Sequence, residues 1–160
     1  MSINSQEDTL QLVTFKIDQE EFGVEILKVH EIIRMMEITK IPNSPDFVKG
    51  VINLRGKVIP IISLRKKFGI SLDDGESNNL RIVVIELNSV VVGFVVDSVS
   101  EVLKIERSVV EPPPDVLTDV DSTYIIGVAK LEDRLLILLD LENLLTEKDK
   151  NFLEKQEKVD

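Results

Sequence analysis

Residues 50 to 60 read Gly50-Val51-Ile52-Asn53-Leu54-Arg55-Gly56-Lys57-Val58-Ile59-Pro60. Two runs rich in valine and isoleucine flank a short polar centre, and such runs favour strands over helices. Gly56 can adopt a positive φ, which tight hairpin turns require. The stretch therefore predicts a β-hairpin with Arg55 at its tip.

Arg55 is unusual at such a tip, because a turn needs glycine or asparagine and has no need of arginine. A guanidinium held out between two apolar strands is a candidate recognition group. The plainer interpretation is a solvated charge on a turn, which is where most arginines lie. Both interpretations stay open at this point.

The same stretch continues into Ile62-Ser63-Leu64-Arg65 and closely resembles the signature of the CheW family of bacterial chemotaxis adaptors. The similarity extends upstream through residues 22–32 and downstream through residues 91–97 and 134–138. It covers roughly residues 12 to 146, which is far more than one short motif.

This resemblance implies a mainly β fold of two tandem SH3-like five-stranded barrels that share a core of valine, isoleucine and leucine, with short helices and a C-terminal helix. It also implies an adaptor that couples methyl-accepting chemotaxis receptors to the histidine kinase CheA through protein–protein contacts, without cofactors. One surface would bind the cytoplasmic tip of the receptor, and another would bind the regulatory domain of the kinase.

Matching the family motif residue by residue gives two candidate surfaces. The receptor side comprises Val29, Glu31, Gly50, Val51, Asn53, Leu54 and Arg55. The kinase side is expected on the second lobe, at Val99, Val102, Leu103, Tyr124, Ile126 and Leu131.

Composition limits the classes of partner. The formal net charge of -10 repels phosphate backbones and anionic membrane surfaces. The chain has no cysteine, which excludes disulfides, thiolate catalysis and cysteine-bound metal. Because residues 1–10 lack a signal peptide and no apolar run is long enough to span a membrane, we expect a cytoplasmic protein, recruited to the membrane through receptors.

The periodicity predicts a strand from Leu12 to Ile17 with one solvated face that includes Thr14, after a disordered arm of residues 1–10. We favour a strand over residues 27–36. Ser44 predicts a short helical turn that Gly50 ends.

The second part of the chain predicts two further hairpins, over residues 81–96 and 124–139. The first is apolar throughout and should be central. Caps at Ser63, Asp140 and Thr146 predict short helices after the strands and a C-terminal helical tail over residues 147–160. The acidic loop of residues 73–79 is the best internal boundary.

The two halves of the chain match each other. A shift of 70 residues places Gly23 on Gly93, and a shift of 77 places Gly50 on Gly127. We therefore expect a domain over residues 11–146 with one lobe over about 12–72 and a second over about 80–146. In this alignment Arg55 falls on Glu132, so the charge of the hairpin tip reverses.

Catalytic and metal-binding patterns are nearly absent. His30 is the only histidine, and no nucleotide-binding or hydrolase motif occurs. Asp97 and Asp121 each precede a serine, as in aspartic proteases, but neither has the glycine that should follow. We therefore predict no catalytic residues, no metal and no enzyme activity. The remaining alternatives are a fragment of a CheA-type regulatory domain and a structural β domain that oligomerises.

Overall fold

The computed structural model describes residues 8–70, 78–87, 90–113 and 124–158, whose strands form two sheets. Sheet A has the order β8 (Ser98–Glu106), β1 (Thr9–Ile17), β2 (Glu20–Glu25), β11 (Arg134–Leu139), β10 (Ile125–Leu131) and β9 (Val110–Glu111). Sheet B has the order β3 (Val29–Arg34), β6 (Arg81–Leu87), β7 (Val90–Val96), β5 (Lys57–Ser63) and β4 (Val48–Leu54). The prediction of a mainly β fold is confirmed.

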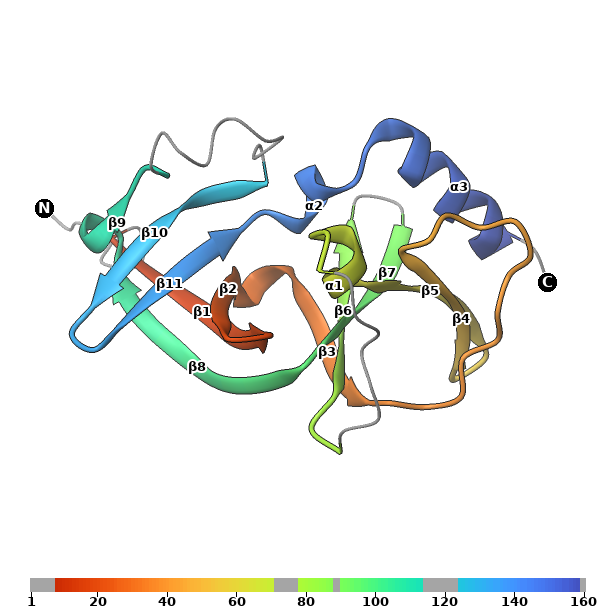
Figure 1. Ribbon diagram of the computed structural model, residues 1–160, viewed down its shortest axis with the longest axis horizontal. Coiled ribbons are helices and arrows are strands. Elements are labelled where there is room, and N and C mark those ends of the chain that lie inside the picture. The colour runs from red at the N-terminus through yellow and green to blue at the C-terminus, as the bar shows by residue number, and fades with distance from the viewer. Residues whose placement is uncertain (1–7, 71–77, 88–89, 114–123, 159–160) are drawn as a thin grey trace, which may run out of the picture.

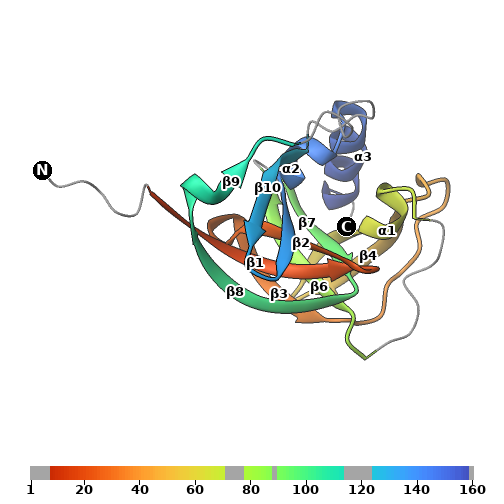
Figure 2. The same ribbon diagram turned by 60° about the vertical axis from the view of Figure 1, so that its left-hand side comes forward.

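Short helical segments connect or follow the strands. They are η1 (Ile26–Lys28), α1 (Leu64–Lys67), η2 (Arg107–Val109), α2 (Leu141–Leu144) and α3 (Glu147–Lys158). Figure 1 shows sheet A on the left and sheet B on the right, with α3 beside β5 and β7. We call the two parts barrel A and barrel B; Figure 2 shows them with the strands of barrel A brought forward.

The internal repeat holds at the level of strand register. Shifting the β1–β2 pair Phe15↔Phe22 by 70 residues gives the β6–β7 pair Ile85↔Val92. Even the irregularities repeat: the bulge at Lys49 in β4 has its counterpart at Ile126 in β10. These correspondences are too detailed for a chance match of apolar residues.

The halves are nevertheless interleaved in space, which differs from two lobes of about 12–72 and about 80–146. β1 and β2 join strands of the second half in sheet A, and β6 and β7 join strands of the first half in sheet B. Parallel pairs join the halves at equivalent places, Gly23↔Leu138 and Gly93↔Ile61. Similarity between the halves does not indicate which strands pair across them, so sequence gave no sign of this exchange.

One large apolar cluster packs the two barrels against each other. It contains Phe15 and Val24 from sheet A together with Ile62, Ile85 and Phe94 from sheet B. Nearly all of β6 and β7 is buried, so the described strands confirm the prediction of a central apolar hairpin.

Two expectations about the first strand were wrong. β1 already begins at Thr9, so the N-terminal arm cannot extend to residue 10 as a disordered segment. Thr14 is fully buried, because the face of β1 that we expected to be solvated also carries Leu10 and Leu12, which pack with Leu136 and Leu138 inside barrel A. The buried Thr14 hydroxyl has a hydrogen-bond partner, because it donates to the Glu101 carbonyl oxygen of β8 at 3.2 Å.

The chain does turn after Ser44, where the Val48 N–H donates to the Pro45 carbonyl oxygen at 3.0 Å, but the expected cap at Ser44 and the end at Gly50 are wrong. The Ser44 hydroxyl donates to the Ile41 carbonyl oxygen at 3.0 Å, and Gly50 lies inside β4 at a φ of 145°. A Cβ on Gly50 would lie 2.1 Å from the Thr39 carbonyl oxygen. Glycine is therefore required here for the close approach of two backbone segments, not to end a helix.

The three helix caps were predicted correctly. The Ser63 hydroxyl accepts from the Lys66 N–H, and the Asp140 carboxylate accepts from the Glu142 N–H. At α3, the Thr146 hydroxyl accepts from the Asp149 N–H, and the Asp149 carboxylate accepts from the Thr146 N–H in return. This reciprocal pair fixes where α3 begins on barrel B.

Candidate partner-binding surface

The turn between β4 and β5 consists of Arg55 and Gly56, both with positive φ, at 52° and 86°. Two consecutive residues of this conformation make the turn that matches the twist of a hairpin, and asparagine or glycine is usual at the first. The Asn53 side-chain oxygen accepts from the Gly56 N–H at 2.9 Å and holds the turn. Arginine thus occupies a position that the backbone alone would not select.

The Arg55 side chain is 67% exposed and forms an ion pair with Glu31 of β3. β3 and β4 are the two edge strands of sheet B and are not hydrogen-bonded neighbours. The ion pair between Arg55 and Glu31 therefore joins the two edges of the sheet. The backbone of Val51 completes the closure, since it exchanges hydrogen bonds with Thr39 at 2.8 and 2.9 Å. Four of the predicted receptor-side residues therefore lie at the seam that closes barrel B: Glu31, Val51, Asn53 and Arg55.

Apolar side chains lie beside this seam. Leu54 is half-buried and packs against the apolar cluster inside barrel B, and so do Ile33 and Met35. Ile32, adjacent to Glu31, is exposed on the outer face of β3. Ile32 was not among the residues predicted from the sequence, and it lies on the opposite face of β3 from Glu31.

Val29 lies apart from the other receptor-side candidates. It packs against the core shared by the barrels and lines a depression with Leu27, His30 and Glu142. Leu27 is 95% exposed. That exposure was not predicted, but the alignment of Leu27 with the polar Asp97 in the repeat was a signal for it.

Barrel A has a comparable closure. Arg134 of the β10–β11 hairpin donates to Glu101 of β8 at 2.5 Å and lies 3.4 Å from Glu21. Glu101 corresponds to Glu31 in the repeat, so an arginine from the hairpin reaches the equivalent glutamate in each barrel. Barrel A therefore has an arginine for this contact despite the reversed charge at Glu132, but it comes from the first residue of β11 and not from the tip.

The predicted kinase-side residues do not form one patch. Leu103 and Leu131 pack in the small apolar cluster of barrel A, while the Tyr124 ring stacks on Phe68 with centroids 5.7 Å apart. Of the others, Val99 is half-buried against the shared core, and Val102 and Ile126 are exposed on β8 and β10.

The described residues offer little sign of a catalytic or metal-binding site. His30 is exposed on β3, and no group of three or more metal-binding side chains occurs in that part of the chain. Asp97 is held by Arg65, and Asp121 lies outside the described residues. Among the described helices, none combines the length and the apolar character needed to cross a membrane.

Comparison with known proteins agrees with this geometry. A family model described as the CheW-like domain matches residues 11–149. The chain is 41% identical over 142 residues to the chemotaxis protein CheW of Klebsiella aerogenes, covering 87% of this chain and 83% of that protein. It is 37% identical over 140 residues to the chemotaxis protein CheW of Helicobacter pylori, again covering 87% and 83%.

A solved structure is similar over nearly the same range. The crystal structure of the scaffolding protein TtCheW from Thermoanaerobacter tengcongensis superposes with a TM-score of 0.78 at 41% identity. The match covers 86% of this chain and 88% of that one.

Proposed function

Because this chain belongs to the CheW family, we propose that it is a chemotaxis adaptor that couples methyl-accepting receptors to the histidine kinase CheA. The relatives are named chemotaxis proteins, and the similar solved structure is named a scaffolding protein. The adaptor acts by holding partners in place, with no chemistry on this chain. It works in the cytoplasm, at the inner face of the membrane where the receptors are.

The receptor binds at the closing seam of barrel B. The observation that supports this is the exposed Arg55, held by its ion pair with Glu31. The half-buried Leu54 precedes Arg55 in the chain, and the exposed Ile32 follows Glu31 in β3. A rigid cation beside apolar side chains suits the face of an amphipathic helix that carries carboxylates. Arginine in such a place is often a residue on which binding depends.

The kinase binds on barrel A. The exposed Val102 of β8 supports this, because it lies next to Glu101 and offers apolar surface on a strand at the edge of sheet A. An exposed edge with apolar residues is suited to packing against another β domain. The two partners then occupy different barrels and bind at the same time.

A matched pair of variants tests this assignment. Ile32 and Val102 are equivalent in the repeat, and both are exposed. Ile32→Glu should weaken binding of a receptor cytoplasmic fragment and spare the CheA regulatory domain, and Val102→Glu should do the opposite, as measured by titration calorimetry. Failure of the unmodified chain to bind either partner would refute the adaptor function itself.

A further inference from the structure

The last helix, α3, ties the C-terminal end of barrel A to barrel B. The chain leaves β11 of sheet A through α2, and α3 then packs beside β5 and β7 of sheet B (Figure 1). The family model that matches this chain ends at residue 149, so most of α3 lies beyond the matched residues. How α3 is attached is therefore a property of this chain beyond the matched domain.

Few apolar side chains attach α3 to barrel B. Phe152 and Leu153 are the two apolar residues of this 12-residue helix. Among the α3 side chains that the structure describes, Leu153 alone is buried, and Phe152 packs half-buried against the same apolar cluster. A helix of this length with so polar a sequence is marginal in water by itself. α3 therefore forms only while it is docked on barrel B.

A single carboxylate links the start of α3 to α1. Asp149 accepts from the Lys67 side chain at 2.9 Å, and it also accepts from the Thr146 N–H at 3.0 Å, which caps the helix. The Lys67 ammonium in turn lies 4.1 Å from the centroid of the Phe47 ring. Because Asp149 serves both the cap and the ion pair, formation of α3 and its docking depend on the same group.

The contact between α3 and the central hairpin of β6 and β7 is loosely packed. A pocket of about 160 Å³ lies between them, lined by Leu87, Val90 and Val92 of the hairpin and by Lys150, Leu153 and Glu154 of α3. The three hairpin side chains are buried. Protein interiors contain few voids larger than a water molecule, so a pocket of this size indicates weaker packing than in the rest of the core.

We propose that α3 is a strap that opens as one unit about the junction at Leu145 and Thr146, and that its opening uncovers the apolar end of the central hairpin. Leu145 has an extended backbone between the two helices α2 and α3, which separates them into independent units. The barrels stay folded in the open state, because Leu153 is the one described α3 side chain that leaves the buried core. Local openings of this kind require less free energy than global unfolding. The inference does not depend on which partners the adaptor binds.

Hydrogen exchange of the intact chain, followed by NMR at low urea concentrations, tests the proposal. The amides of residues 150–158 should share one opening equilibrium and one urea dependence. They should exchange about 100-fold faster than those of β6 and β7 after correction for intrinsic rates. Simple fraying would instead give rates that increase gradually toward Lys158. Lys67→Gln lies outside α3 but should accelerate all of these amides about tenfold, because it removes the hydrogen bond to Asp149.

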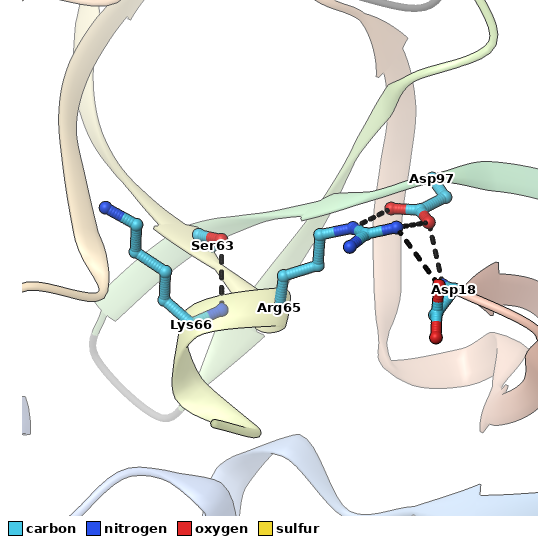
Figure 3. Close-up of polar contacts among 5 residues, drawn as sticks. All are labelled: Asp18, Ser63, Arg65, Lys66 and Asp97. Carbon is cyan, nitrogen blue, oxygen red and sulfur yellow. Dashed lines mark hydrogen bonds and ion pairs between the residues drawn. The ribbon is translucent and has the colours of Figure 1, made fainter. Parts of the chain in front are cut away.

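The control is an ion pair of the same short helix α1 that does not involve α3. Arg65 donates to both oxygens of the Asp97 carboxylate, at 2.9 and 2.7 Å (Figure 3). These two side chains are about as little exposed as Lys67 and Asp149. Arg65→Gln should leave the exchange of α3 unchanged. Equal acceleration of the α3 amides by Arg65→Gln and Lys67→Gln would overturn the proposal.

Thiol labelling tests whether the opening uncovers the hairpin. The chain has no cysteine, so Val90→Cys and Val83→Cys each give one buried thiol. Val90 lines the pocket beneath α3, whereas Val83 lies elsewhere in the same apolar cluster. The thiol at residue 90 should react through the opening of α3, and about tenfold faster when Lys67→Gln is added, whereas the thiol at residue 83 should react only through global unfolding.

Two results would contradict the strap. If the thiols at residues 90 and 83 react at the same rate with and without Lys67→Gln, α3 does not uncover the hairpin. If the amides of residues 150–158 exchange only together with those of β6 and β7, α3 does not open by itself. Either result overturns the proposal.

Discussion

Arg55 has a backbone conformation that arginine rarely adopts, and this makes its role in folding separable from its role in binding. A left-handed conformation costs an ordinary residue about 1–2 kcal/mol. The exposed ion pair with Glu31 returns about 0–1 kcal/mol. The gain from the ion pair does not exceed the cost of the conformation, so stability alone does not explain an arginine here. A role in binding would explain it.

We predict that Arg55→Asn leaves the free energy of unfolding unchanged or raises it by up to about 1 kcal/mol, because asparagine suits this turn. Receptor binding should weaken by roughly 2 kcal/mol, and Arg55→Glu should weaken it further by repelling Glu31. Kinase binding should persist in both variants. Urea denaturation and receptor-fragment titration measure the two effects in parallel.

Lys57→Asn is the control, because it removes an exposed positive charge from the same hairpin. It should affect receptor binding much less than Arg55→Asn. Equal losses in the two variants would mean that the hairpin contributes only general charge, and that Arg55 is a solvated turn residue.

Two carboxylates make the stability of the molecule depend on pH. Burial alone would raise the pKa of Asp97, but hydrogen bonds from Arg65 and the Asp18 N–H outweigh it and lower this pKa below its ordinary value. Burial would also raise the pKa of Asp149, but hydrogen bonds to its carboxylate from Lys67 and from the Thr146 N–H outweigh burial and lower this pKa. Both groups therefore stabilise the folded state while they are ionised.

We predict that the free energy of unfolding falls as the pH is lowered from about 5. In the unfolded chain an aspartate side chain takes up its proton near pH 3.9, whereas in the folded protein Asp97 and Asp149 do so only at lower pH. This stabilisation is fully present above the unfolded pKa and is lost as the pH drops through the folded pKa. Asp97→Asn should reduce the slope. Urea denaturation between pH 3 and pH 7 measures it, and an unchanged slope would contradict the ionised pairing.

At the scale of elements, local signals in the sequence predicted local structure well. Each hairpin has its apolar runs on either side of a turn, and each cap has its oxygen at the right distance from a free N–H. What these signals do not contain is the pairing of β2 with β11 and of β5 with β7. Those contacts depend on the packing of both halves, and the same holds for the ion pair of Arg55 with Glu31, whose members were predicted separately.

Glycines of β4 and of the loop after α1 allow a prediction about closure of barrel B. Gly50→Ala should destabilise the protein by about 1–3 kcal/mol or more, because the new methyl group would collide with the Thr39 carbonyl oxygen and strain a positive φ. Gly69 also has a positive φ, but a Cβ there would meet nothing within 4 Å.

Gly69→Ala should therefore cost only about 1 kcal/mol, the price of the backbone conformation. Thermal unfolding of both variants gives the comparison. Equal destabilisation would show that the approach of Thr39 to β4 is not what requires glycine at residue 50.

At the scale of the whole molecule, the exchange of strands means that neither half can complete a barrel. β1 and β2 lack their partners in sheet A without the second half, and β6 and β7 lack theirs in sheet B without the first. The core that joins the barrels likewise takes residues from both halves. We therefore expect one cooperative unfolding transition for the intact chain.

Division of the chain within residues 71–77 tests this expectation most directly. Each half expressed alone should lack stable structure, because strand edges and core residues that the other half covers would be exposed to water. Mixing the halves should restore the fold, since their contacts require both chains but no covalent link between them. Amide NMR spectra of each half and of the mixture make the measurement. Dispersed, stable spectra for a half on its own would contradict interleaved barrels, whereas dispersion that appears only on mixing, with one melting transition, is the result that this architecture requires.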